Sequence, residues 1–312
     1  MSPAQANQPL PSGFWVGNYM IESQLSMGGF SIVYLGRDIF GEAVAIKEYL
    51  PNALALRAGE SLEPVISERH RAAFNHGLNC FFEEGRNLAS LNHPNVVRVL
   101  NFFRANGTAY MVMKFEQGRT LQAHIQKHTG TLTEDFIRGL FGHLMNGLRE
   151  VHSKKLLHLD IKPGNIYLRQ DGSPVLLDFG AARQVVGQEV PQLRTMHTPG
   201  YAAPEQYEKD NTNLLGPWTD IYGVGATIYA CLSGRPPMDA SHRIQKDEMV
   251  PAVRQFAGRY SRQLLETVDI CLQLDALKRL QSAHALQKRL ASPERDIGHP
   301  GLLNRLKDFV KR

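Results

Sequence analysis

The hydrophobic pattern of this chain changes its period at residues 114–118. Before this point, Phe30, Ile32 and Tyr34 alternate with Ser31, Val33 and Leu35 in a short run rich in β-branched and aromatic residues, which is typical of β-strands. After it, apolar residues recur every three or four positions, for example over residues 137–151, which predicts helices. We therefore expect an α+β fold in which a small β-rich lobe precedes a larger, mostly α-helical lobe.

The domain boundaries follow from this change. Residues 14–113 are expected to form the N-terminal lobe, a five-stranded antiparallel sheet with one main helix, whose last two strands lie at 96–100 and 108–113. Residues 114–118 form the hinge and residues 119–290 the helical lobe. Residues 1–13, rich in Pro, Gln and Ser, are interpreted as a disordered leader. Residues 291–312 are interpreted as a basic amphipathic helix, for which docking on the helical lobe is favoured over a membrane or a partner helix.

The composition excludes several classes of protein. Hydrophobic residues make up 43% of the 312 positions without any run of eighteen apolar residues, so neither a membrane span nor membrane contact is expected. The net charge is +5, but Lys and Arg are dispersed, so nucleic acid is not an expected partner. Cys80, Cys231 and Cys271 lie far apart, which indicates reduced thiols and a cytoplasmic location. No feature indicates an oligomeric state.

Residues 158–165, HLDIKPGN, combine three groups that phosphoryl transfer requires. This chemistry needs a carboxylate that orients the acceptor hydroxyl and takes its proton, a cation near the transferred phosphate, and an oxygen ligand for magnesium. Asp160, Lys162 and Asn165 could supply these in turn, and their spacing fits the catalytic-loop pattern H-x-D-x-x-x-x-N. A plain turn before a strand, with Pro163 and Gly164 in the turn, would have the same composition. The other parts of the chain decide between these alternatives.

Those other parts occur in order. Residues 25–33, LSMGGFSIV, predict a glycine-rich hairpin whose backbone can approach phosphates, and residues 43–47, AVAIK, end a strand in a lysine. A helix is predicted from the spacing of Phe74, Leu78, Phe81, Leu88 and Leu91. Glu84 lies on its apolar stripe, where a buried carboxylate needs a cation such as Lys47. The triplets DFG at 178–180 and APE at 203–205 follow. From about residue 19 to 290, this ordered set resembles the eukaryotic-like protein kinase superfamily, in particular its bacterial serine/threonine members.

The resemblance implies a bilobal protein kinase fold and an ATP-dependent serine/threonine protein kinase that acts on proteins and also phosphorylates itself. ATP and Mg²⁺ are the implied cofactors. The implied catalytic residues are Asp160, Lys162 and Asn165, and the implied metal ligands are Asn165 and Asp178. The residues implied to bind ATP are Ser26, Gly28, Gly29, Val33, Ala45, Lys47, Glu84, Met113, Lys114 and Glu116.

Five further residues receive roles from the same resemblance. Thr195 and Thr198 are candidate phosphorylation sites. Glu205 is expected to pair with Arg279, and Asp220 is expected to bind the backbone of the catalytic loop through hydrogen bonds. These last three roles are structural rather than chemical.

The chain also departs from the family pattern. Leu159 replaces the arginine that usually holds a phosphorylated activation segment, so we expect activity to depend little on phosphorylation of Thr195 or Thr198, although Arg183 could contact such a phosphate. Ser26 and Ser31 replace glycines of the nucleotide loop. These departures motivate an alternative, a pseudokinase that acts as a nucleotide-binding interaction scaffold. A small-molecule phosphotransferase is a third hypothesis, but it would lack the segment that ends at Glu205.

Overall fold

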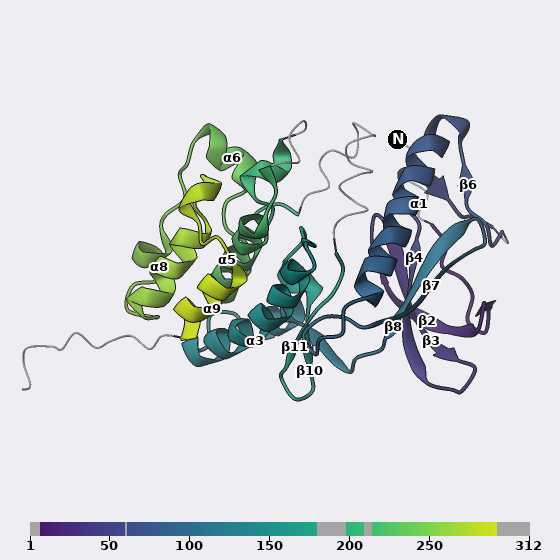
Figure 1. Ribbon diagram of the computed structural model, residues 1–312, viewed down its shortest axis with the longest axis horizontal. Helices are drawn as coiled ribbons and strands as arrows, with labels where there is room; N and C mark the ends of the chain where they lie inside the picture. The colour runs from purple at the N-terminus through teal and green to yellow at the C-terminus, as the bar shows by residue number, and fades with distance from the viewer. Residues whose placement is uncertain (1–6, 60, 180–197, 209–213, 292–312) are drawn as a thin grey trace, which may run out of the picture.

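The structure is a computed structural model that describes residues 7–59, 61–179, 198–208 and 214–291. Figure 1 shows a β-rich lobe on one side, a helical lobe on the other, and the β10–β11 hairpin between them. This arrangement agrees with the α+β organisation expected from the two hydrophobic periods.

The N-terminal lobe is built on an antiparallel sheet with the strand order β1-β2-β3-β4-β8-β7. Five of these strands correspond to the predicted sheet, and the sixth, β1, has only two residues. Their bounds are β1 Trp15–Val16, β2 Tyr19–Met27, β3 Ser31–Asp38, β4 Ala43–Tyr49, β7 Val99–Ala105 and β8 Thr108–Lys114. The prediction for β7 was about three residues too early, because Val96 forms an isolated bridge to Leu176 instead of a ladder.

One long helix, α1 (Glu68–Ala89), packs on this sheet. Its buried positions include Phe74, Leu78, Phe81 and Leu88, which is the spacing predicted from the sequence. Glu84 is buried on the same face. A small two-stranded ladder, β5 (Ala55–Leu56) with β6 (Val65–Ile66), precedes the helix.

The prediction of a disordered leader is wrong for residues 7–13, which the structure places against the N-terminal lobe. Asn7 and Leu10 are buried, and the Leu10 amide donates a hydrogen bond to the Tyr34 hydroxyl at 3.1 Å. Burial of an apolar side chain and pairing of polar groups offset the entropy cost of ordering this segment. Residues 1–6 and the predicted helix at 292–312 lie outside the described residues.

The C-terminal lobe is helical and is organised around α5, whose residues are almost all buried. Its helices are α2 (Leu121–Lys127), α3 (Glu134–Ser153), α5 (Pro217–Ser233), α6 (Ala240–Gln245), α7 (Ala252–Gln255), α8 (Arg262–Cys271) and α9 (Ala283–Ala291). Short 3₁₀ turns are η1 (Pro163–Asn165), η3 (Pro204–Tyr207) and η5 (Ala276–Lys278). A small sheet of β9 (Gly118–Thr120), β10 (Ile166–Arg169) and β11 (Pro174–Leu176) lies next to the hinge.

The two lobes are connected by more than the hinge. The Val97 amide donates to the Leu176 carbonyl and the Leu176 amide donates to the Asn95 carbonyl, both at 2.9 Å. Val175 also belongs to the hydrophobic core of the N-terminal lobe. The candidate catalytic loop, which lies between α3 and β10, is therefore anchored at the lobe junction.

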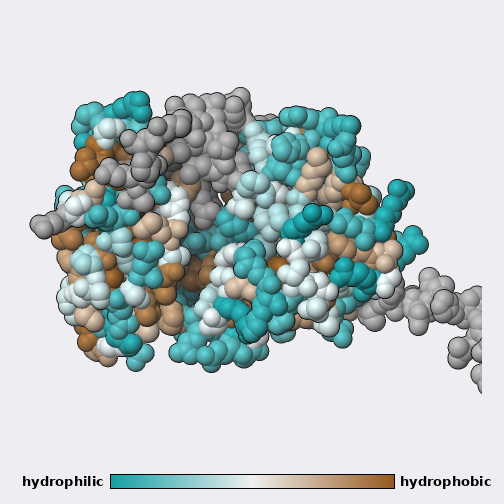
Figure 2. All heavy atoms as spheres, turned by 180° about the vertical axis from the view of Figure 1, so that it is seen from behind, coloured by the Kyte–Doolittle hydropathy of each residue, from teal (hydrophilic) through white to brown (hydrophobic). Residues whose placement is uncertain are grey.

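The face turned away from the viewer in Figure 1 is largely hydrophilic, with hydrophobic residues in separate patches (Figure 2). Within the described part of the chain, none of the helices combines the length and the hydrophobicity needed to cross a membrane.

Candidate active site

The backbone of the catalytic loop is held by one buried carboxylate. Asp220, near the start of α5, accepts hydrogen bonds from the amides of His158 (2.9 Å) and Leu159 (2.8 Å). This contact is the one predicted for Asp220. Leu159 has a φ of 63°, in the left-handed region, and its carbonyl accepts a hydrogen bond from the Gln206 side chain at 2.9 Å. Residues of α5 and η3 therefore hold the left-handed backbone of Leu159 in place.

Asp160 lies at the centre of a polar cluster. Its Oδ2 accepts a hydrogen bond from Asn165 Nδ2 at 2.6 Å and lies 3.0 Å from Lys162 Nζ. Asn165 Nδ2 also donates to the Asp160 carbonyl at 2.9 Å. The structure therefore brings together the three residues predicted to be catalytic, with the carboxylate held between an amide and an ammonium group.

Thr198 also belongs to this cluster. The sequence did not predict its contacts with Lys162 and Asp160. Its hydroxyl accepts a hydrogen bond from Lys162 Nζ at 2.7 Å and donates to Asp160 Oδ1 at 3.1 Å. A phosphate on this oxygen would bring negative charge against Asp160 and remove the hydroxyl proton that binds it. Thr198 contacts two of the residues predicted to be catalytic, and its role as a phosphorylation site stays a prediction. The other candidate phosphorylation site, Thr195, lies outside the described residues, as does Arg183.

Lys47 forms a different ion pair from the predicted one. It is buried at the inner face of β4, and its Nζ lies 2.9 Å from Asp178 Oδ1. In the part of the chain that the structure describes, this is the ion pair that Lys47 makes, so the predicted pairing with Glu84 is wrong for this structure. The sequence offered Glu84 as the partner of the lysine, and the structure pairs the ammonium with Asp178 instead.

Asn165 and Asp178 meet the chemical requirements of a magnesium site. The Asn165 amide nitrogen points to Asp160 and, at 3.4 Å, to the Asp178 carbonyl, which leaves its Oδ1 as the ligand-type atom. Asp178 follows β11, and its φ of 45° is again in the left-handed region. One amide oxygen and one carboxylate are hard oxygen donors of the kind that Mg²⁺ prefers, with phosphate oxygens completing the shell.

Several residues predicted to bind the nucleotide lie on three neighbouring strands, β3, β4 and β8. Val33 of β3 lies opposite Lys47 of β4, and Ala45 lies opposite Met113 of β8. The glycine-rich turn between β2 and β3 contains Gly28 and Gly29, and Ser26 lies at the end of β2. This register places the predicted apolar walls and the predicted phosphate-binding groups on one side of the lobe.

The hinge is braced by a bidentate ion pair. Arg169 of β10 donates to both carboxylate oxygens of Glu116, at 2.8 and 2.9 Å, and to the Pro94 carbonyl at 2.8 Å. The hydrogen bond from Arg169 lowers the pKa of the Glu116 carboxyl. Lys114 Nζ lies 3.9 Å from Glu116. The side chain of Glu116 therefore holds the hinge, while its backbone remains the group predicted to face a nucleotide.

A buried ion pair anchors the segment that follows Thr198. Arg279 binds Glu205 through two contacts, of 2.7 and 2.9 Å, and Thr219 donates to the same carboxylate at 2.8 Å. The predicted contact between Glu205 and Arg279 is thus present. It ties η3 to the N-terminus of α5 and to η5.

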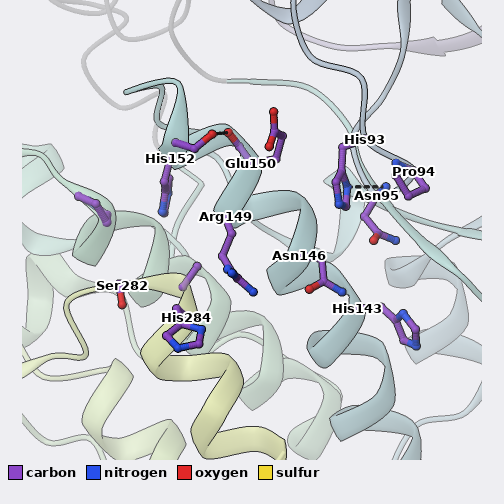
Figure 3. A pocket seen from close by; sticks show the side chains of 13 residues that line it. His93, Pro94, Asn95, His143, Asn146, Arg149, Glu150, His152, Ser282 and His284 are labelled. Carbon is purple, nitrogen blue, oxygen red and sulfur yellow. Dashed lines mark hydrogen bonds between the residues drawn. The ribbon is translucent and has the colours of Figure 1, made fainter.

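A separate hollow lies beside α3 and the start of α9 and is also lined by residues 93–95, which precede the hinge (Figure 3). Its volume is about 800 Å³, and the side chains of His93, His143, His152 and His284 line part of it. His152 Nε2 lies 2.8 Å from Asp220 Oδ2. The carboxylate that holds the catalytic loop is therefore in contact with a residue of this hollow.

Several contacts that support the site were not predicted from the sequence. Thr198 was predicted only as a candidate phosphorylation site, and no role was predicted for Arg169. Glu48 lies at the end of a predicted strand and Arg57 lies in the irregular stretch that follows it, and their buried ion pair, with contacts of 2.5 and 2.8 Å, was not predicted. Such contacts depend on how distant segments pack, so sequence spacing does not identify them.

Comparison with known proteins places these features in context. Residues 19–291 match the family model described as protein kinase domain. Serine/threonine-protein kinase pkn2 of Myxococcus xanthus is 31% identical over 296 residues, which cover 88% of this chain and 32% of that protein. Serine/threonine-protein kinase C of Synechocystis sp. is 29% identical over 284 residues, which cover 87% and 49%. The chain thus spans about a third of the first relative and about half of the second.

A solved structure is also similar. The apo form of PpkA-294 has a TM-score of 0.82 and 36% sequence identity with this chain, and the alignment covers 90% of this chain and 99% of that one.

Proposed function

Since the chain belongs to the protein kinase family, we propose that it is an ATP-dependent serine/threonine protein kinase. It transfers the γ-phosphate of Mg-ATP to serine or threonine hydroxyls of proteins, its own included. The observation that carries this proposal is the cluster in which Asp160 contacts Asn165, Lys162 and Thr198 within 3.1 Å.

Each group of the cluster has a chemical task. Asp160 orients the acceptor hydroxyl and takes its proton while the hydroxyl oxygen bonds to the γ-phosphorus. The bond from that phosphorus to the β–γ bridging oxygen breaks, and ADP leaves. Lys162 stabilises the negative charge of the transferred group, and Lys47 binds the phosphates of the nucleotide. Magnesium held by Asn165 and Asp178 would supply further charge neutralisation at the phosphate oxygens.

The proposal is tested with two matched aspartate variants. Asp160→Asn should lower kcat for transfer from Mg-ATP to a generic protein substrate by about 10²- to 10⁴-fold, because the general base is lost. Nucleotide affinity, measured by calorimetry, should change little. Asp135→Asn, an exposed position in the first turn of α3, should behave like the wild type.

The same experiment examines the scaffold alternative. If the wild type binds Mg-ATP tightly but transfers no phosphate to itself or to any protein substrate, the proposal is wrong and the pseudokinase reading replaces it. The contacts of Asn165 with Asp160 and with the Asp178 carbonyl, and of Lys47 with Asp178, favour the enzyme.

A further inference from the structure

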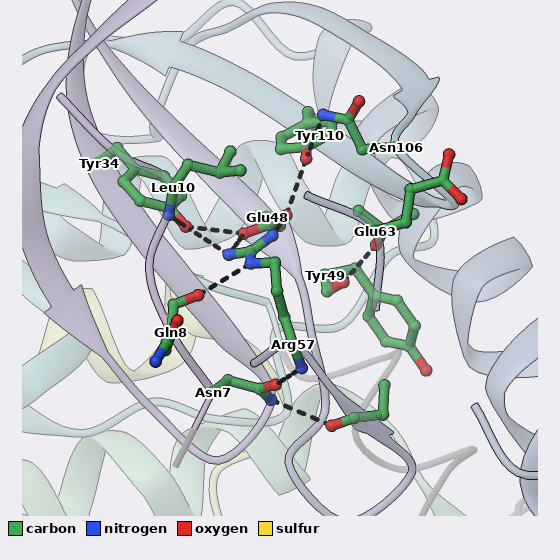
Figure 4. A network of polar contacts seen from close by, with 12 residues as sticks. Asn7, Gln8, Leu10, Tyr34, Glu48, Tyr49, Arg57, Glu63, Asn106 and Tyr110 are labelled. Carbon is green, nitrogen blue, oxygen red and sulfur yellow. Dashed lines mark hydrogen bonds and ion pairs between the residues drawn. The ribbon is translucent and has the colours of Figure 1, made fainter. Parts of the chain in front are cut away.

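A buried polar network lies behind the strand that carries Lys47 (Figure 4). Neighbouring residues of a strand point to opposite faces of the sheet, so Glu48 faces away from the site that Lys47 faces. Glu48 is fully buried and forms two contacts with Arg57, itself 2% exposed. The hydroxyls of Tyr34 and Tyr110 also donate to Glu48, each at 2.8 Å. This charge is therefore paired and satisfied, and it fixes the segment around Arg57 to the sheet.

The N-terminal segment is part of the same network. The Arg57 amide donates to Asn7 Oδ1 at 2.5 Å, and Arg57 Nε donates to the Gln8 carbonyl at 2.8 Å. Asn7 is 2% exposed, and its Nδ2 donates to Asn52 Oδ1 at 2.7 Å and to the Ala55 carbonyl at 3.1 Å. Asn7 is thus a bridge between residues 52, 55 and 57.

This bridge continues to the glycine-rich loop. The Asn52 amide donates to the Gly29 carbonyl at 2.9 Å, and its side-chain amide reaches the Gly28 carbonyl at 3.5 Å. The Leu50 amide donates to the Phe30 carbonyl at 2.8 Å. These bonds extend the β3–β4 ladder beyond its last strand residues and into the loop. Because Gly28 and Gly29 have little intrinsic conformational preference, such external bonds decide how well the loop is ordered.

We propose that Asn7 and Asn52 are positioning residues of the nucleotide site, through which the N-terminal segment holds the glycine-rich loop in its phosphate-binding conformation. This inference rests on the proposed function. Without the bridge, the loop occupies its binding conformation for a smaller fraction of the time, and the apparent affinity for nucleotide falls by that fraction. The chemical step, which depends on Asp160, is not affected.

The test uses the full chain and the variants Asn7→Ala, Asn52→Ala and the double variant. We expect the KM for ATP and the Kd for Mg-ATP to rise about 3- to 10-fold, with kcat and the KM for the protein substrate within about twofold of the wild type. Hydrogen exchange of the backbone amides of residues 26–31 should be faster in both single variants. The double variant should be no worse than the more affected single variant, because both substitutions break one chain of contacts.

The matched control is Gln8→Ala, an exposed side chain on the same segment that should leave all these quantities unchanged. Asn7 is buried, and Asn7→Ala could prevent folding. In that case Asn52→Ala alone tests the inference, because Asn52 is exposed and its substitution leaves the core intact. A variant that is merely less stable would lower the active fraction, and hence the apparent kcat, without raising the KM for ATP.

Three results would overturn the inference. Unchanged exchange in residues 26–31 would mean that the bridge does not order the loop, and faster exchange with an unchanged KM for ATP would mean that the order is irrelevant to binding. Absence of Mg-ATP binding by the wild type would refute the proposed function itself and the inference with it. Mg-ATP binding by the wild type, measured first, distinguishes this last case from the first two, which both require that the wild type binds nucleotide.

Discussion

Leu159 combines an unusual backbone with an apolar side chain. A left-handed conformation costs a residue other than glycine on the order of 1 kcal/mol. The hydrogen bonds to Asp220 and Gln206 offset that cost. The backbone of the loop is therefore fixed by neutral and acidic partners on α5 and η3. These hydrogen bonds hold the catalytic loop without a charged side chain at position 159.

Activity is accordingly expected to depend little on phosphate on the activation segment, residues 178–205. Dephosphorylated protein should keep its initial rate on a generic substrate to within about twofold, because Leu159 offers no charge to a phosphate. Rates would be compared for phosphatase-treated and untreated protein, with phosphorylation at the end of each assay read by mass spectrometry. Thr195→Ala should give the same rate as the wild type. A loss of activity in both cases, with nucleotide binding intact, would contradict this prediction.

Thr198 should matter through its hydroxyl rather than through phosphorylation. Thr198→Ala removes the group between Lys162 and Asp160, and misplacement of the catalytic carboxylate should lower kcat about 10- to 100-fold. Thr198→Ser keeps the hydroxyl and should retain most of the activity. Steady-state kinetics of the two variants would be compared at equal folded fraction. Equal activity of the alanine and serine variants would show that these hydrogen bonds do not position Asp160.

His158 makes stability depend on pH. Burial lowers the pKa of its imidazole, and its neutral ring satisfies both partners, donating from Nε2 to the Leu177 carbonyl and accepting at Nδ1 from the Asp160 amide. The unfolded chain takes up a proton at about pH 6.5, whereas the folded protein does so only at lower pH. The contribution of His158 is therefore complete above about pH 6.5 and is lost as the pH falls below it.

Urea denaturation at pH 7.5 and 5.5 tests this sign. The unfolding free energy should fall more steeply with acidification in the wild type than in His158→Gln. His143→Gln, at an exposed histidine, should keep the wild-type dependence. The explanation fails if the two variants show the same pH dependence.

At the scale of elements, the Glu205–Arg279 pair joins three segments of the C-terminal lobe. Arg279→Leu should lower the unfolding free energy by about 3–5 kcal/mol, because it leaves a buried carboxylate without its cation. The double variant Glu205→Gln, Arg279→Leu should be less destabilised than Arg279→Leu alone. The control is Arg262→Ala, which breaks an exposed ion pair with Glu266 and should cost less than about 1 kcal/mol. Denaturant titration gives the unfolding free energies of the three variants. Equal losses of stability for Arg279→Leu and Arg262→Ala would contradict the prediction.

The elements that could be predicted from the sequence are those with a local period. The runs around Val33 and Ala45 predicted β3 and β4, and the spacing of Phe74 to Leu88 predicted α1. The motifs likewise indicated that Asp160, Asn165 and Asp178 would meet. The distances between these side chains could not be predicted from the sequence. For this reason Glu84, rather than Asp178, was predicted as the partner of Lys47.

The N-terminal segment was the other failure, and its cause is similar. Asn7 and Arg57 are about fifty positions apart and meet because both pack on the outer face of the sheet. Neither lies in a periodic run. A polar, proline-containing stretch such as residues 7–13 has the composition of a disordered one, and only its partners on the sheet make it ordered.

At the scale of the whole molecule, the two lobes share part of their interior. Val151 of α3, Val175 of β11 and Phe179 belong to the hydrophobic core of the N-terminal lobe, although they follow the hinge in the chain. Arg169 adds polar contacts to Glu116 and to the Pro94 carbonyl. Loss of either lobe therefore exposes apolar surface of the other, and the two should unfold together.

The two tryptophans report on this coupling, because Trp15 lies in β1 and Trp218 in α5. In Trp15→Phe and Trp218→Phe, the remaining tryptophan monitors the C-terminal and the N-terminal lobe respectively, and the two urea midpoints should coincide. Val175→Ala, introduced into each of these two backgrounds, should lower both midpoints equally, with a loss on the order of 2 kcal/mol from the cavity at the lobe junction. Midpoints that differ in the single-tryptophan proteins, or a shift confined to the signal from Trp15, would mean that the shared core does not couple the lobes.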